Sequence, residues 1–128
     1  MIKYEKVKGG YLVTEKISTY TNIKIDKSIL NVTSNMNVEG KISLYPGFFW
    51  DGATGAIDTD DIMEASAFHD FICNAYEDGR LTKYQRKLGD KMFKSKLKET
   101  DMSKFRIKYI YQVVRKFLEL KGWLKKIT

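Results

Sequence analysis

The stretch from Gly47 to Asp90 constrains the fold most, because it contains a glycine-containing loop and two helical patterns separated by only a short turn. The first pattern covers residues 59–76 and begins with a threonine and two acids, which favour a helix N-terminus. Asp78 and Gly79 end it, and the second pattern runs from residue 81 or 82 to about residue 99. With so short a turn between them, we predict that the two helices pack as an antiparallel hairpin.

Strand patterns dominate the chain before this loop. Short runs of β-branched and aromatic residues are separated by Gly, Asn, Asp and Ser, which are typical of turns. These runs predict three or four antiparallel strands in a curled sheet. They cover residues 11–16, 17–26, 29–34 and 40–46.

A third helix is expected over residues 104–120, where large apolar residues recur every four positions. The predicted fold class is therefore α+β, with N-terminal antiparallel strands followed by three helices. At 128 residues the chain fits a single domain. Its parts are a strand-rich segment at 1–46, a glycine-containing loop at 47–58 and a helical segment at 59–128.

The cysteine content and the hydropathy bear on the compartment. Cys73 is the only cysteine, so no disulfide can form within the chain, and a reducing environment is expected. The N-terminus lacks the apolar run of a signal peptide, and no run approaches the roughly 18 residues of a membrane span. We therefore expect a soluble, cytoplasmic protein.

Charge is distributed unevenly along the chain, whose formal net charge is +7. Residues 59–79 carry six acids and no base, whereas residues 80–128 carry sixteen bases and four acids. Such a basic segment suits an anionic membrane or an acidic protein partner, although a solvated lysine-rich face is the commoner explanation. Nucleic acid is the least favoured partner, because the sequence has neither zinc-finger spacing nor a clear helix-turn-helix or RNA-binding pattern.

His69 is the only histidine, and it lies on the first predicted helix. Asp90 follows 21 positions later, so an antiparallel hairpin would place the two side chains opposite each other. An imidazole oriented by a carboxylate is the arrangement of a general base. Two simpler interpretations stay open, namely that His69 is a packed core residue and that Asp90 pairs with Arg86 or Lys94 one turn away.

Further carboxylates surround this pair in the sequence. Asp70 is adjacent to His69, and we expect it to project toward the loop that contains Asp51. Carboxylate and backbone carbonyl oxygens that converge in this way suit a hard cation such as calcium. The alternative is that Asp51 only caps the loop.

The motifs GFFWDGAT, AFHDF and GDKMF resemble a family of small phage and prophage proteins of undefined function. The family pattern is G-F-x-x-D-x-A-S-x-P, then H-D-x-x-Y, then A-D-x-x-F, ending with a tyrosine-containing helix, and the match covers residues 47–122. Thr54 replaces the serine of the pattern, Ala56 the proline and Cys73 the tyrosine. The residues that fall on the pattern are Asp51, Ala53, His69, Asp70, Asp90 and Phe93.

The same residues also resemble the secreted prokaryotic type of phospholipase A2. That resemblance implies calcium held by the carboxylates of Asp51 and Asp70 and by the carbonyl of Gly52, with His69 taking a proton from water and Asp90 orienting His69. The two cysteines that flank this site in that family are alanine and serine here. In H-D-x-x-Y the tyrosine hydroxyl helps to hold the orienting aspartate, and the thiol that replaces it here is a poor substitute donor.

Two functions of different classes follow. The first is calcium-dependent hydrolysis of a lipid ester, catalysed by His69 and Asp90, with the basic helices resting on an anionic membrane. The second is a non-catalytic phage protein that acts in the virion, in lysis or by binding a host factor, and that keeps the histidine and the aspartate for structure. Either protein would act in the cytoplasm of the infected bacterium or be associated with the virion.

Overall fold

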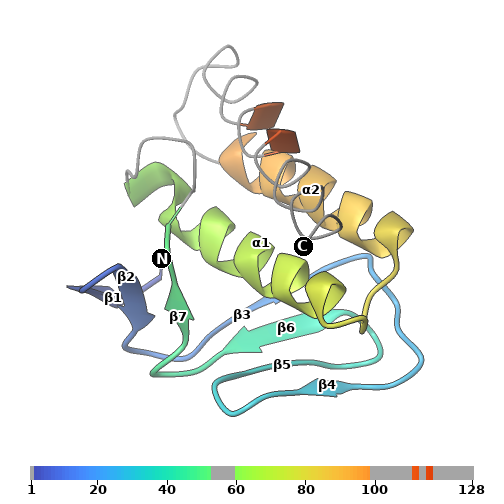
Figure 1. Cartoon of the computed structure of the whole chain (residues 1–128), viewed down its shortest axis with the longest axis horizontal. Helices are drawn as coiled ribbons and strands as arrows, with labels where there is room; N and C mark the ends of the chain where they lie inside the picture. The colour runs from blue at the N-terminus through green and yellow to red at the C-terminus, as the bar shows by residue number, and fades with distance from the viewer. Residues whose placement is uncertain (1, 53–59, 99–110, 113–114, 117–128) are drawn as a thin grey trace, which may run out of the picture.

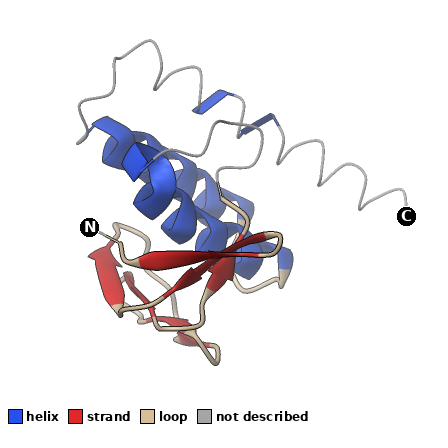
Figure 2. Ribbon diagram, turned by 90° about the vertical axis from the view of Figure 1, so that its left-hand side faces the viewer, coloured by secondary structure: helices blue, strands red, loops and turns tan. Residues whose placement is uncertain are grey.

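The computed structural model describes residues 2–52, 60–98, 111–112 and 115–116. It is an α+β structure in which two small antiparallel sheets from the N-terminal half are followed by two packed helices. Figure 1 shows the first helix lying over the strands and the second helix lying beside the first. Figure 2 shows the same arrangement from the side, with the strands below the helices.

The first sheet has the strand order β1-β2-β7, with β1 at Tyr4–Val7, β2 at Gly10–Val13 and β7 at Phe49–Trp50. A tight turn joins β1 to β2, and Val7 is paired with Gly10. The short strand β7 returns from the end of the strand region and pairs Trp50 with Tyr11 of β2. The last strand of this sheet therefore leads directly into the loop that precedes the helices.

The second sheet has the order β3-β6-β5-β4. Its central strand β6, at Lys41–Leu44, pairs with β3, at Ile17–Tyr20, and with β5, at Ser34–Met36. The edge strand β4, at Ile29–Leu30, pairs only with β5. On β6, Ile42 and Leu44 are fully buried, so one face of this sheet supplies the core.

The strands are shorter and more numerous than the sequence predicts, and they form two sheets rather than one. Thr21 ends β3, because its hydroxyl donates to the Gly40 carbonyl and accepts from the Ile23 amide. The predicted strand over 29–34 is interrupted by a turn in which the Asn31 amide donates to the Ser34 carbonyl. These side-chain and turn bonds compete with the ladder and end the strands locally.

Helix α1 spans Asp60–Glu77, within one residue of the predicted range at each end. Its C-terminus is closed by Gly79, which has a φ of +78°, and by bonds from the Gly79 and Arg80 amides to the carbonyls of Tyr76 and Ala75. This pair of bonds is the Schellman arrangement, which strongly favours glycine at that position. The predicted stop at Asp78 and Gly79 is confirmed.

Helix α2 spans Lys83–Lys98, again close to the predicted range. Thr82 caps it, because its hydroxyl accepts from the Gln85 amide while the Gln85 side-chain carbonyl accepts from the Thr82 amide. This reciprocal capping box satisfies two amides that would otherwise lack partners. The sequence Thr-x-x-Gln thus fixes where α2 begins.

Gly89 allows α2 to approach α1 closely. A Cβ atom at this position would lie 2.6 Å from Cγ2 of Ile72, a separation that real Cβ atoms do not adopt. Ile72 is fully buried, so it has little room to move away. The absence of a side chain at position 89 therefore sets the distance between the two helices next to Asp90.

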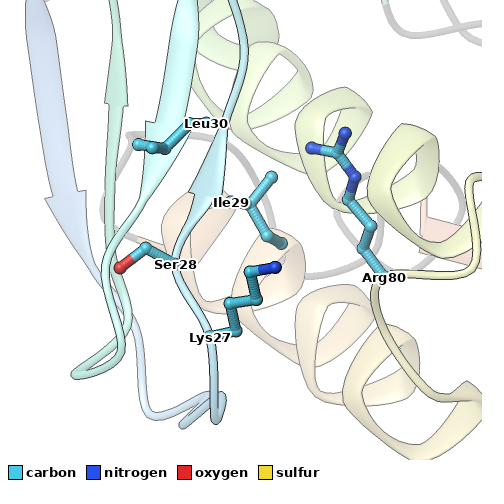
Figure 3. Close-up of a pocket in the computed structure, with 5 residues that line it drawn as sticks. All are labelled: Lys27, Ser28, Ile29, Leu30 and Arg80. Atoms are coloured by element: carbon cyan, nitrogen blue, oxygen red, sulfur yellow. The ribbon is translucent and has the colours of Figure 1, made fainter.

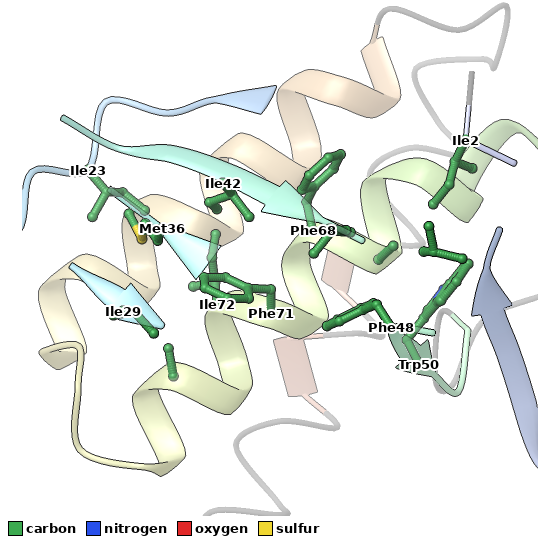
Figure 4. Packing of buried hydrophobic residues seen from close by; sticks show 14 of the residues in the cluster. Ile2, Ile23, Ile29, Met36, Ile42, Phe48, Trp50, Phe68, Phe71 and Ile72 are labelled. Atoms are coloured by element: carbon green, nitrogen blue, oxygen red, sulfur yellow. The ribbon is translucent and has the colours of Figure 1, made fainter. Parts of the chain in front are cut away.

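The core lies between the sheets and α1 (Figure 4). Phe68, Phe71 and Ile72 of α1 pack toward buried strand residues such as Ile42 and Met36. Because α1 is covered by the sheets on one side and by α2 on another, most of its residues are buried, including polar ones. A helix that is buried nearly all round can hold a histidine away from water.

Part of the predicted helical segment lies outside the described residues. Of the third helix expected over 104–120, only residues 111–112 and 115–116 are described, and they are helical. The start expected at Thr59 and most of the loop after Gly52 also lie outside the described residues. Among the helices that are described, none is long and apolar enough to cross a membrane.

The contact at Gly89 predicts that Gly89→Ala destabilises the protein by about 1–3 kcal/mol, because the added methyl group overpacks the contact with Ile72. Intrinsic helix propensity alone would make the alanine variant more stable by about 1 kcal/mol, so a destabilised variant would show that overpacking outweighs propensity. Urea denaturation measures the change in the free energy of unfolding. The matched control is Ser95→Ala, on an exposed position of the same helix. If Gly89→Ala were as stable as the wild type, close helix packing at this point would be excluded.

Candidate functional site

His69 and Asp90 form a direct contact between the two helices. Nε2 of His69 and Oδ1 of Asp90 are 2.7 Å apart, and only 5% of His69 and 2% of Asp90 are exposed. The predicted hairpin therefore does bring these two residues together. The alternative pairing of Asp90 with Arg86 or Lys94 is not found, since Arg86 lies over the Tyr76 ring and Lys94 over the Tyr111 ring.

The imidazole also contacts an aromatic ring and a thiol. The ring of Phe93 on α2 lies 5.0 Å from the imidazole centroid at an interplanar angle of 36°. Cys73, one turn along α1, places Sγ 3.8 Å from Nδ1 and 3.9 Å from Nε2. Because the sulfur is almost equidistant from both nitrogens, it is aligned with neither of their in-plane bonding directions. The thiol therefore contacts the ring without forming a well-directed hydrogen bond.

The pKa of His69 reflects opposing effects. Burial alone lowers it, but the neighbouring Cys73 and the hydrogen bond to Asp90 outweigh burial and raise the pKa from 6.5 to about 10. At neutral pH the ring is then an imidazolium whose Nε2–H donates to the Asp90 carboxylate. The contact is accordingly a buried ion pair.

One oxygen of the aspartate is left over. Oδ2 of Asp90 and Nε of Arg86 are buried and have no hydrogen-bond partner among the described residues. The Arg86 guanidinium lies over the ring of Tyr76, with its Cζ atom 5.1 Å from the ring centroid. Within the part of the chain that the structure describes, the Asp90 carboxylate is therefore hydrogen-bonded through Oδ1 alone.

Asp51, Gly52 and Asp70, the calcium ligands expected from the sequence, are all among the described residues, and the calcium site stays a prediction. Asp51 is exposed, and Gly52 is buried with a φ of +86°. The carboxylate of Asp70 accepts a bond of 3.3 Å from Asn74 one turn along α1. In the described part of the chain, no group of three His, Cys, Asp or Glu side chains is placed to hold a metal ion.

A buried polar contact that the sequence analysis missed joins the strands to α1. Nε1 of Trp50, on β7, donates to the Ser66 hydroxyl at 3.1 Å, and that hydroxyl donates to the Met63 carbonyl. Trp50 is fully buried, so its indole N–H needs a partner. The tryptophan next to the loop and a serine on the apolar stripe of the helix were the available signals. The contact fixes α1 against the first sheet one turn before His69.

Comparisons with protein-family models, with curated protein sequences and with solved structures found no significant match to this chain.

The raised pKa of His69 makes stability depend on pH. The folded-state value of about 10 exceeds the unfolded value of 6.5, so folding is stabilised fully below pH 6.5. That stabilisation is lost as the pH rises through the folded-state pKa. We therefore expect the free energy of unfolding to fall between pH 6.5 and about 10.

Urea denaturation of the wild type and of Asp90→Asn between pH 6 and about 10 measures this dependence of the free energy of unfolding on pH. Near pH 6 the Asp90→Asn variant should be less stable than the wild type by about 3 kcal/mol, the usual scale for breaking a buried pair. The difference should shrink as the pH approaches 10. Asp78→Asn makes the same chemical change at an exposed position and should follow the wild type. A wild-type stability that rises over this range would contradict the ion pair.

Proposed function

We propose that this chain is a non-catalytic phage protein, a binding module in which His69 and Asp90 serve as a structural ion pair. The observation that carries the proposal is the burial of both partners at a separation of 2.7 Å between the two helices. A buried pair of this kind determines how the two helices pack, and this role requires no catalysis. Breaking it would cost stability rather than activity.

The protonation state of His69 supports a structural role. A general base needs an unprotonated nitrogen, and its pKa should lie near the working pH. A pKa raised to about 10 leaves both nitrogens of His69 protonated at neutral pH. The nearby thiol is not aligned with Nδ1, so Cys73 is not arranged as a nucleophile activated by the histidine.

The assignment to phage rests on the motif resemblance, which runs from the G-F-x-x-D loop through H-D to the aspartate on the second helix. For such a protein we propose a role in the virion, in lysis or in binding a host factor, within the infected bacterium or the particle. The exposed lysines of α2 suit an acidic surface on that partner, or an anionic membrane. Lys83, Lys87 and Lys91 are exposed there, whereas the one acid of α2, Asp90, is buried.

The second candidate is a phospholipase-A2-like hydrolase, and one observation favours it. Asp90 engages Nε2 of His69, so Nδ1 is the nitrogen left to take a proton from water at an ester. For this role the imidazole would have to lose its proton when substrate binds. The calcium site implied by that resemblance would consist of Asp51, Gly52 and Asp70, and we derive no step through it.

A paired assay separates the two candidates. Purified protein is mixed with phospholipid vesicles with and without calcium, and release of fatty acid is measured for the wild type and for His69→Gln. Calcium binding is measured by calorimetry on the wild type, on Asp70→Asn and on the exposed control Asp78→Asn. The proposal predicts no ester cleavage that depends on His69, no saturable calcium binding and a lower thermal stability of His69→Gln.

Calcium-dependent cleavage that a folded His69→Gln variant has lost would overturn the structural role. Calcium binding that Asp70→Asn abolishes and Asp78→Asn retains would also favour the hydrolase. Circular dichroism of each variant establishes that it is folded before its activity is compared.

A further inference from the structure

An open pocket of about 390 Å³ lies between the edge of the second sheet and the turn that follows α1. It is lined by Lys27, Ser28, Ile29, Leu30 and Arg80. In Figure 3 the ammonium group of Lys27 and the guanidinium group of Arg80 face the space between strand β4 and this turn. The side chains of Ser28 and Leu30 point away from that space, and Ile29 lies between the two cations.

The position of Arg80 is fixed by the fold. Its backbone amide closes the C-terminal cap of α1, and its Nη1 donates to Oδ1 of Asn31 at 3.0 Å. Asn31 is itself held, because its side-chain amide donates to the Ser34 hydroxyl at 3.2 Å. The guanidinium is therefore anchored through a neutral acceptor, and its remaining donors are available to a ligand.

The positive charge in this pocket is not neutralised. In the described part of the chain, neither Lys27 nor Arg80 forms a salt bridge with a carboxylate. Two cations from distant parts of the sequence are thus held on one concave surface, where their charges repel each other in the absence of an anion. An anion placed between them would relieve that repulsion and accept several charge-assisted hydrogen bonds.

We propose that this pocket binds a ligand that carries a phosphate group. A guanidinium opposite an ammonium matches the several oxygens of a phosphate, and Arg provides the forked donors that phosphates favour. Ile29 also lines the pocket, but it is a core residue and only 3% exposed, so the two cations supply the main contacts to the ligand. The volume of about 390 Å³ exceeds what a bare phosphate fills, so the ligand is a phosphate ester.

The phosphate group could belong to a soluble phosphate ester or to a lipid headgroup. Apolar surface beside the pocket is what a lipid would contact. Leu30, the last residue of β4, is 74% exposed, and Val32, on the turn between β4 and β5, is 100% exposed. A soluble phosphate ester would use only the cations, whereas a lipid would also contact this turn. The pocket is separate from the His69 pair, because the end of α1 at Glu77 lies about 12 Å of helix beyond His69.

The test is calorimetric titration of the purified protein with inorganic phosphate and with glycerol 3-phosphate. Lys27→Gln and Arg80→Gln should each weaken binding about tenfold, because each removes one charged partner. Lys27 donates no side-chain hydrogen bond within the described residues, so Lys27→Gln should leave the fold intact. Lys6→Gln, an exposed lysine on β1, removes the same charge elsewhere and should bind like the wild type.

Vesicles of phosphatidylcholine with and without phosphatidic acid identify the source of the phosphate. Binding to phosphatidic acid vesicles that Lys27→Gln weakens would assign the pocket to a lipid headgroup, and binding of glycerol 3-phosphate alone would assign it to a soluble ester. Failure of every probe to bind saturably would overturn the proposal. An equal loss of affinity in Lys6→Gln would overturn it as well, because the binding would then follow net charge. Neither result bears on the role of His69.

Discussion

The contact between His69 and Asp90 is the interaction on which the helical half of the protein depends. It joins residues 21 positions apart through a bond of 2.7 Å that is closed off from water. Two conditions make it possible, namely a turn short enough to return the chain and a helix approach close enough for Asp90 to reach across. Gly79 provides the first and Gly89 the second.

The sheets determine that this contact is buried. Trp50 and the apolar residues of β6 cover one side of α1, and the Trp50 bond to Ser66 fixes the helix one turn before the histidine. With α2 on another side, the contacts of His69 include Phe93, Cys73 and Asp90. Burial lowers the pKa of this imidazole, whereas the neighbouring Cys73 and the hydrogen bond to Asp90 raise it. Together these two neighbours outweigh burial.

The helices and the His69 contact could be predicted because they depend on local signals. A helix cap, a stop at Gly79 and a regular apolar period define the two helices. The spacing of 21 residues then places Asp90 opposite His69. The strands could not be predicted as well, because hydrogen bonds of Thr21 and Asn31 end them at points that periodicity does not mark. The expected approach of Asp70 to Asp51 depends on the path of the loop after Gly52, which periodicity does not predict, and it stays a prediction. The pocket at Arg80 forms where the second sheet packs near the turn after α1, and no sequence pattern predicts that these two distant segments come together.

The proton on His69 is the most direct test of the structural role. Because His69 is the only histidine, its Cε1 proton gives one nuclear magnetic resonance signal that can be assigned without mutagenesis. If the ring is an imidazolium held by Asp90, this signal will keep its position over roughly pH 5 to 8, and Asp90→Asn will bring the titration down into that range. A wild-type signal that titrates with a midpoint near the ordinary 6.5 would contradict the ion pair and favour a general base.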